Sequence, residues 1–204
     1  MRRIPLSHRS HIIGFQPLPT GTVEHESALE RDFVVLSNFL DPAALISSQP
    51  MTIRYPVGSV IRRYTPDYLV AWSDGRREIV EVKYWSELRA SQEQLKERFA
   101  AMREWAQLRG AGFRVATERD IRGCVLENAR RLLPLRSAPL DPTIAQSVTG
   151  VVRECGAACI TDVVTAVPAD RACAVAAIWG LLARGSLYVD CTQPITPSSI
   201  VRLP

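Results

Sequence analysis

The stretch TPDYLVAWSDGRREIVEVKYW, residues 65–85, decides how the surrounding chain folds. Two runs of strand-forming residues flank the turn-forming triplet at 73–75, which predicts an antiparallel β-hairpin. Three charged residues, Asp67, Glu81 and Lys83, stand among the apolar residues of its arms. Whether these charges meet depends on the register of the hairpin.

Two turns are sterically possible in this hairpin. A two-residue turn would leave Asp67 facing away from Glu81. A three-residue loop at 73–75 places the two directly opposite, and opposite residues of an antiparallel pair face the same side. Gly75 suits the positive φ that ends this loop, but the turn alone does not decide between the two. We predict the three-residue loop because it places Asp67, Glu81 and Lys83 on one face. The other face then holds apolar side chains, namely Tyr68, Val70, Val80 and Val82.

Two carboxylates directly opposite each other repel, and burying them without partners is costly. A divalent cation between them removes the repulsion, and Mg²⁺ accepts one or two carboxylates. An ammonium two residues along can orient a metal-associated water or stabilise charge developing on a phosphate. The pattern predicts a phosphodiester-hydrolysis site that uses Mg²⁺, with Mn²⁺ as a substitute. Asp67 and Glu81 are the predicted metal ligands, with the Val82 carbonyl as a further one, and Lys83 is catalytic. The alternative is a solvated hairpin with a salt bridge.

Such a site commonly takes another carboxylate from an upstream helix. The apolar spacing predicts a helix that begins near Ser27 and ends at Asp41-Pro42. Glu30 is the candidate carboxylate. Ser27 and Glu30 also fit a capping box, in which Glu30 would only cap the helix. Glu26, one turn earlier on the same face, is the other candidate.

The segments SALERDF (27–33), TPDYLV (65–70) and IVEVKYW (79–85) resemble the TnsA-type endonuclease subunit of heteromeric cut-and-paste DNA transposases. This family lies within the PD-(D/E)xK restriction-endonuclease-like superfamily. The resemblance continues through a long helix to GFRVATERDI (112–121). The family pattern maps onto Glu30, Asp67, Glu81 and Lys83, and so favours Glu30 over Glu26.

The resemblance implies a division of labour. This chain would hydrolyse the 5′ strand at transposon ends and leave 5′-phosphate and 3′-hydroxyl products. A separate DDE-type transposase would cut and join the 3′ ends, and an AAA+ ATPase regulator would link both to target selection. Two alternatives stay open: a stand-alone restriction- or repair-type nuclease, and a non-catalytic DNA-binding or assembly module that retains the fold.

The sequence predicts an α/β fold in four parts. Residues 1–23 are basic and rich in proline and glycine, which predicts an extended N-terminal arm. Residues 24–133 form the nuclease domain, a restriction-endonuclease-like mixed sheet flanked by helices. A proline-rich linker at 134–141 follows. Residues 142–204 predict three helices and a β-ribbon, the order of a winged helix.

The predicted elements can be given by range. Strands are expected at 51–55, 59–64, 66–72, 77–84, 113–117, 186–190 and 199–203. After the first helix, further helices are expected at 88–109, 118–131, 142–155, 159–167 and 170–184.

The net charge of +4 and pI of about 9.0 permit a nucleic-acid partner without demanding one. The phosphate contacts expected with double-stranded DNA are Arg62, Arg63, Arg76 and Arg77. Tyr84 and Trp85 either stack on DNA or pack under the long helix. The helix at 170–184 offers few cations, so we expect its domain to contact a protein rather than read a DNA groove.

The five cysteines make no C-x-x-C pair, which predicts buried free thiols rather than a zinc site. The basic start lacks the apolar core of a secretory signal, and no apolar run is long enough to span a membrane. We expect a cytoplasmic bacterial protein.

Overall fold

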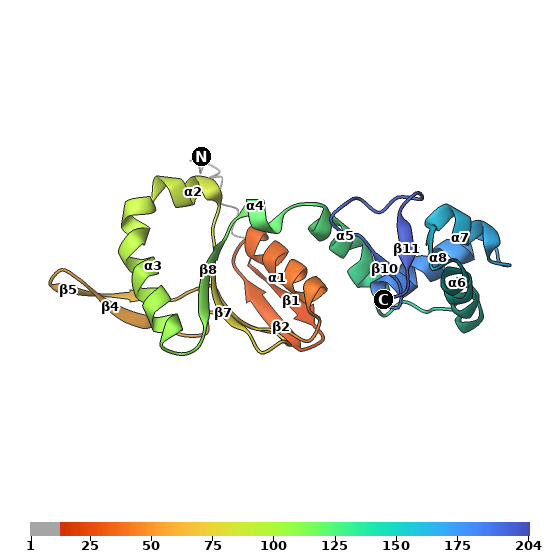
Figure 1. Cartoon of the computed structure of the whole chain (residues 1–204). Helices are drawn as coiled ribbons and strands as arrows, with labels where there is room; N and C mark the ends of the chain where they lie inside the picture. The colour runs from red at the N-terminus through yellow and green to blue at the C-terminus, as the bar shows by residue number, and fades with distance from the viewer. Residues whose placement is uncertain (1–12) are drawn as a thin grey trace, which may run out of the picture. The chain divides into compact units, whose positions relative to one another are not determined.

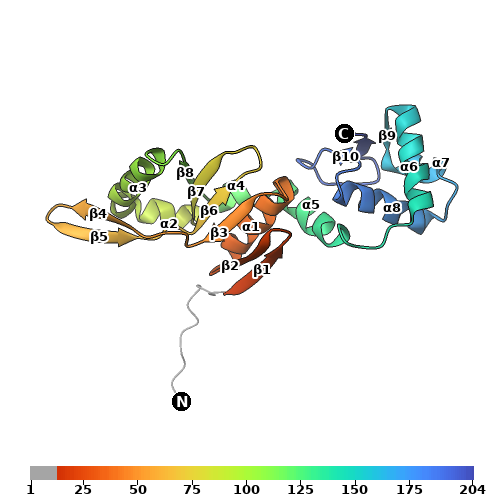
Figure 2. The same cartoon turned by 90° about the horizontal axis from the view of Figure 1, so that it is seen from below.

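The computed structural model describes residues 13–204, which form two compact units that divide between Arg122 and Gly123 (Figures 1 and 2). The N-terminal unit contains the predicted mixed sheet. Its four strands lie in the order β3-β6-β7-β8, with β3 at Leu45–Ser48, β6 at Tyr68–Ala71, β7 at Arg77–Val82 and β8 at Gly112–Ala116. The first three pair antiparallel and β8 pairs parallel with β7.

Helix α1, Ala28–Leu40, covers one face of this sheet. The ring of Phe33 stacks on Tyr68 with centroids 5.4 Å apart. Ser27 caps the helix by accepting the Glu30 N–H at 3.1 Å, and the Asp41 N–H bonds the Ser37 carbonyl at its end. The predicted first helix is therefore confirmed, with the predicted start and stop.

Helix α3, Gln92–Gln107, covers the opposite face, as Figure 1 shows. Phe99 of α3 packs on Phe113 of β8, with ring centroids 5.4 Å apart. The predicted long helix is broken, because α2 at Trp85–Ala90 and α3 are separate helices that meet at Ser91. The core under α3 consists of Ile53, Tyr55, Tyr64, Ile79, Leu95, Phe99, Met102 and Ala106.

Two ribbons stand apart from the main sheet. Strands β4 (Ile53–Val57) and β5 (Val60–Tyr64) form a ribbon whose tip extends beyond α3 in both views (Figures 1 and 2). Strands β1 (Gly14–Leu18) and β2 (Gly21–His25) form a second hairpin. These last two strands replace the arm predicted for residues 1–23, because prolines in an isolated two-stranded hairpin need not donate to a ladder. The rest of that arm lies outside the described residues.

The C-terminal unit begins earlier than expected, with α5 at Cys124–Leu132. The predicted helix at 118–131 is split into α4 (Glu118–Ile121) and α5 by Arg122 and Gly123, whose backbones are extended. The Asn128 amide donates to the Cys191 and Gln193 carbonyls at 3.0 and 2.8 Å, which fixes α5 within the C-terminal unit.

The predicted linker at 134–141 is also part of the C-terminal unit. It begins within a 3-10 turn at Leu133–Leu135, and Arg184 donates to the Ala138 carbonyl. Asp141 then caps α6 by accepting two backbone N–H groups, those of Thr143 and Ile144. The stretch contains prolines because it turns sharply, and it packs as structure rather than serving as a spacer.

The rest of this unit contains the three predicted helices and a small sheet. The helices are α6 at Pro142–Cys155, α7 at Ile160–Ala166 and α8 at Arg171–Ala183. The antiparallel sheet has the order β10-β11-β9, with β10 at Tyr188–Val189, β11 at Ile200–Arg202 and β9 at Ala157–Cys159. Three residues were too few for β9 to show a periodicity in the sequence.

Candidate active site

The hairpin adopts the predicted register. Tyr68 pairs with Val80 in β6 and β7, so one residue further Asp67 comes opposite Glu81. The Trp72 N–H donates to the Arg76 carbonyl at 2.9 Å, which closes a three-residue loop. Gly75 ends that loop with a φ of +88°. The parity argument is confirmed in each of these respects.

The face that carries the charges is also buried. The predicted apolar face is confirmed, since Tyr68, Val70 and Val80 have no exposed surface. On the opposite face Ile79 is equally buried under α3, and only 3% of Glu81 is exposed. A solvated hairpin is therefore not what the structure shows.

Two neighbours compensate the buried carboxylate of Glu81. The Tyr64 hydroxyl donates to Glu81 Oε2 at 2.6 Å, and Lys83 Nζ lies 3.3 Å from Oε1. Burial raises the pKa of Tyr64, and the charges of Glu81 and Asp67 raise it further, so the phenol keeps the proton that it donates. Arg98 of α3 lies over the Tyr64 ring at 5.1 Å. A carboxylate in a core is tolerated when it is paired and hydrogen-bonded in this way.

Asp67 is held less completely. The Val82 N–H donates to its Oδ2 at 2.6 Å. Burial raises the pKa of Asp67 to about 7, with the charges of Glu81 and Glu30 adding to the rise and the Val82 N–H and Lys83 opposing it. The carboxyl group is thus partly protonated at neutral pH, which is how an acidic cluster relieves repulsion without a cation.

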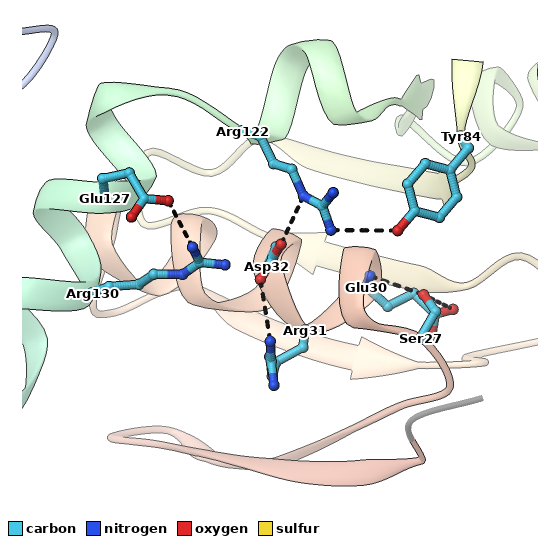
Figure 3. A network of polar contacts seen from close by, with 8 residues as sticks. All are labelled: Ser27, Glu30, Arg31, Asp32, Tyr84, Arg122, Glu127 and Arg130. Carbon is cyan, nitrogen blue, oxygen red and sulfur yellow. Dashed lines mark hydrogen bonds and ion pairs between the residues drawn. The ribbon is translucent and has the colours of Figure 1, made fainter. Parts of the chain in front are cut away.

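Glu30 occupies the capping position that its sequence allowed. Its Oε1 accepts the Ser27 hydroxyl at 2.9 Å and its Oε2 accepts the Glu26 N–H at 2.8 Å. The Tyr68 hydroxyl is 3.5 Å from the same Oε2. The contact between Ser27 and Glu30 is drawn in Figure 3. Glu30 is therefore bound within the helix terminus while its charge acts on Asp67.

A small cavity of about 20 Å³ lies between Asp67 and the carboxylates near the start of α1. That volume is enough for about one water or ion. Both candidates for the helix carboxylate border it. Its lining consists of Glu24, Glu26, Glu30, Ser48, Gln49 and Asp67.

Gln49 is a cavity residue that the sequence did not indicate. Its backbone φ is +43°, a left-handed value that is uncommon for residues other than glycine. Gln49 also precedes Pro50, and a residue before proline normally has an extended backbone. Its N–H donates to the Asp67 carbonyl at 2.8 Å and its side chain donates to Glu26 Oε1 at 2.7 Å. Strained backbone of this kind clusters at functional sites.

The four predicted DNA-contacting arginines lie in two places. Arg62 and Arg63 are exposed on β5. Arg76 and Arg77 lie at the hairpin tip, where Arg76 is paired with Asp74 at 2.6 Å. Arg77 lies four positions before Glu81, roughly 13 Å along the strand. The second pair is therefore distant from the carboxylates.

A polar network fixes the chain just beyond Lys83 (Figure 3). Asp32 of α1 is buried and accepts from Arg122 Nε at 3.0 Å. Arg122 also donates to the Tyr84 hydroxyl at 3.4 Å. The Trp85 ring lies 4.3 Å from the Arg119 guanidinium. Both aromatic residues are half-buried among protein groups, which favours packing over stacking on DNA.

Other expectations concern metals, thiols and membranes. Within residues 13–204 no group of three or more His, Cys, Asp and Glu side chains is arranged to hold a metal ion. The five cysteines are free thiols, but the predicted burial is wrong, because Cys155 and Cys173 are exposed and the other three are only half-buried. Among the described helices, none has the length and apolar composition of a membrane span.

Residues 44–118 match the family model described as TnsA-like endonuclease N terminal. The matched range runs from just before β3 to the start of α4, and so includes Asp67, Glu81 and Lys83 but not Glu30. A comparison with curated proteins gives no match. The mixed sheet with helices on both faces fits a nuclease-like fold, and the match supports a TnsA-like nuclease domain in the N-terminal unit.

Proposed function

We propose that this chain is the metal-dependent DNA endonuclease subunit of a heteromeric cut-and-paste transposase, and that it hydrolyses the 5′ strand at transposon ends. The observation that carries the proposal is the pair of carboxylates on neighbouring strands. Asp67 and Glu81 are opposite each other, and Lys83 contacts Glu81, within the range that matches the TnsA-like family.

The carboxylates suit Mg²⁺ by their chemistry. Mg²⁺ prefers hard oxygen ligands and binds through one or two carboxylates. Burial raises the pKa of Asp67 to about 7, and the charges of Glu81 and Glu30 add to the rise; a bound cation would offset those two charges. Asp67 and Glu81 would hold the ion, with the Val82 carbonyl as a further ligand. When bound, Mg²⁺ or Mn²⁺ would supply an activated water and neutralise charge on the phosphate.

The remaining residues would position the reactants. Lys83, half-buried and paired with Glu81, would orient the attacking water or stabilise charge on the phosphate. Tyr64 would hold Glu81 Oε2 in place. Glu30 would complete a second metal or water site, provided that it exchanged its hydrogen bonds at the helix terminus. The expected products carry a 5′-phosphate and a 3′-hydroxyl.

Double-stranded DNA would be held by exposed arginines. Arg62 and Arg63 lie on the strand that ends at Tyr64, next to Glu81. Arg76 and Arg77, at the hairpin tip, would reach DNA farther from the cleaved bond.

We infer that the C-terminal unit is a winged-helix-like module that contacts a protein. The order α6, β9, α7, α8, β10, β11 is typical of such a module. The middle of α8 is buried, including Ala174, Ile178 and Leu181, so little of it is free to read a groove. A cavity of about 460 Å³ lies beside α8 and is lined in part by Val164, Val175 and Trp179. The DDE-type transposase and the AAA+ ATPase regulator are the partners proposed for it.

Strand-specific cleavage tests the proposal. A transposon-end duplex would be labelled on one strand at a time and incubated with Mg²⁺ and the chain. The incubation would be done without and with the DDE-type transposase of the same element. Cleavage of the 5′ strand that needs the partner supports the proposal. Cleavage of plain duplex by the chain alone favours a stand-alone nuclease. Absence of Mg²⁺ binding by calorimetry favours a non-catalytic module.

The C-terminal role has its own test. The segment 123–204 would be titrated with each partner protein and with transposon-end duplex. We expect it to bind a partner, and to bind DNA only weakly and in a salt-sensitive way. Tight, sequence-specific binding of the duplex without partner binding would return the module to DNA recognition.

A further inference from the structure

The ribbon formed by β4 and β5 has two unlike faces. Ile53 lies opposite Tyr64, and both are buried in the core under α3. The next pair along the ribbon, Arg54 opposite Arg63, therefore faces the other way, because side chains alternate along a strand. The ribbon is anchored by one face and presents the other to solvent.

The outward face carries an unusual charge arrangement. Arg54 and Arg63 are both exposed and directly opposite each other, and like charges in that relation destabilise a ribbon. Within residues 13–204, neither guanidinium forms an ion pair with a carboxylate, whereas Arg76, Arg114 and Arg122 each do. An anion supplied from outside would remove the repulsion between the two.

The tip of the ribbon adds apolar surface to this charge. Val60 is 56% exposed and Ile61 is 64% exposed, and Ile61 lies opposite Pro56 on the face of the arginines. A two-stranded ribbon with cations and exposed apolar side chains has the width and the chemistry to lie along a groove of duplex DNA. An array of phosphates spaced along a backbone complements paired guanidinium groups better than a single anion does.

We propose that the β4–β5 ribbon is the DNA-binding arm of the nuclease unit, and that the Arg54–Arg63 pair binds backbone phosphates of the duplex. The inference rests on the proposed function, since it concerns the substrate of the same site. The proposal adds Arg54 of β4 to the phosphate contacts, as the cross-strand neighbour of Arg63. The contacts are to the backbone and are independent of base sequence.

The base of the arm belongs to the active site. Tyr64 follows Arg63 directly and donates its hydroxyl to Glu81 Oε2 at 2.6 Å. Arg63 and Tyr64 are adjacent, roughly 3.4 Å apart along the strand, and their side chains point to opposite faces of the ribbon. The backbone at the base of the arm therefore links the phosphate-binding side chain to the residue that positions Glu81. Binding by the arm would therefore set where the duplex lies relative to the carboxylates.

The test compares the full chain with an R54Q/R63Q variant by fluorescence anisotropy on a labelled duplex, in EDTA so that cleavage does not interfere. The salt dependence of binding is recorded for each. Removing two phosphate contacts should lower affinity about tenfold at low salt and reduce the slope of log K against log salt by about 1.8. The control is R89Q/R103Q, which removes the same charge from two exposed arginines elsewhere in the unit and should change little.

The outcomes separate the inference from the function on which it rests. The inference would be refuted if R54Q/R63Q bound DNA with wild-type affinity and salt dependence, or if R89Q/R103Q lost as much affinity. A loss of DNA affinity confined to R54Q/R63Q supports the inference even if the wild-type chain cleaves no DNA. Absence of cleavage would contradict only the proposed function. Thermal melting of R54Q/R63Q should match or exceed the wild type, because the variant removes the repulsion.

Discussion

Two hairpins of the N-terminal unit place like charges directly opposite each other, and they deal with the repulsion in different ways. Glu81 is buried and Asp67 is half-buried, and the protein itself supplies a phenol, an ammonium and a retained proton to offset their charge. Arg54 and Arg63 are exposed, and within the described chain no carboxylate pairs with them. The charge of a buried carboxylate must be compensated for the unit to fold, whereas two exposed like charges can remain uncompensated until a ligand binds.

The comparison also indicates why the two pairs lie where they do. Tyr64 connects the arginine ribbon to the carboxylate hairpin through one short hydrogen bond. The region that would hold the polyanion and the region that would cut it are therefore parts of one packed unit. Changes on the buried side should alter both chemistry and folding, and changes on the exposed side should alter binding alone.

The largest effects on cleavage are expected at Lys83 and at the two carboxylates. Lys83→Ala should lower strand cleavage by about 100-fold or more, since it removes charge stabilisation of the transition state. Lys96→Ala, which removes an exposed ammonium from α3, is the matched control and should leave the rate unchanged. The assay is single-turnover cleavage in saturating Mg²⁺. A wild-type rate for Lys83→Ala would refute the site.

The two carboxylates should differ in stability although both are needed for cleavage. Asp67→Asn should lower cleavage by orders of magnitude and leave thermal stability equal or higher, because repulsion is relieved while the amide oxygen can still accept from the Val82 N–H. Glu81→Ala should also abolish cleavage but destabilise the unit by about 1–3 kcal/mol, since the buried Tyr64 hydroxyl loses its acceptor. Urea unfolding of both variants decides the matter, and equal stability changes would contradict the comparison.

Tyr64→Phe isolates the link between the two hairpins. It keeps the ring under Arg98 but removes the donor to Glu81 Oε2. We expect a loss of about 1–3 kcal/mol in the free energy of unfolding, and a slower cleavage step with substrate affinity little changed. Tyr55→Phe, in the same cluster, is the control. Normal cleavage by Tyr64→Phe would show that Glu81 does not depend on this bond.

The sequence predicted what parity and local chemistry determine. Only two registers were available to the hairpin, and one of them placed the three charged residues on a single face, so Asp67 and Glu81 could be paired without a structure. The capping box at Ser27 and Glu30 could also be predicted, because its hydrogen bonds join residues three positions apart.

What the sequence did not reveal depends on contacts between distant segments. Tyr64 meets Glu81 only because α3 gathers the ribbon and the sheet into one core. Gln49 gave no sign of its positive φ, since glutamine before proline rarely adopts it. The compact units divide before α5, and not in the proline-rich stretch, because Asn128 bonds carbonyls more than sixty residues later, a contact that local composition does not indicate.

The buried pair also predicts a pH dependence. The folded-state pKa of Asp67, about 7, is raised above its usual value of 3.8, so the folded chain binds this proton more tightly than the unfolded chain does. Its contribution to stability is present below about pH 4 and is lost as pH rises to 7. Asp67→Asn should therefore gain stability over the wild type progressively between those values and keep the gain at pH 8. Melting curves at pH 5 and pH 8 measure it, and a constant difference would contradict the raised pKa.

The smallest effect on folding is expected at the helix terminus, where Glu30 has two roles to separate. Glu30→Ala removes the acceptor of two hydrogen bonds and a favourable charge at the helix N-terminus, a loss of about 1 kcal/mol or less. Glu30→Gln keeps an acceptor oxygen and should restore most of that stability. If Glu30 also serves the reaction, Glu30→Gln should still cut several-fold more slowly, whereas Glu26→Gln, which borders the same cavity, should cut normally. Normal cleavage by Glu30→Gln would assign Glu30 to the cap alone and leave the chemistry to the hairpin.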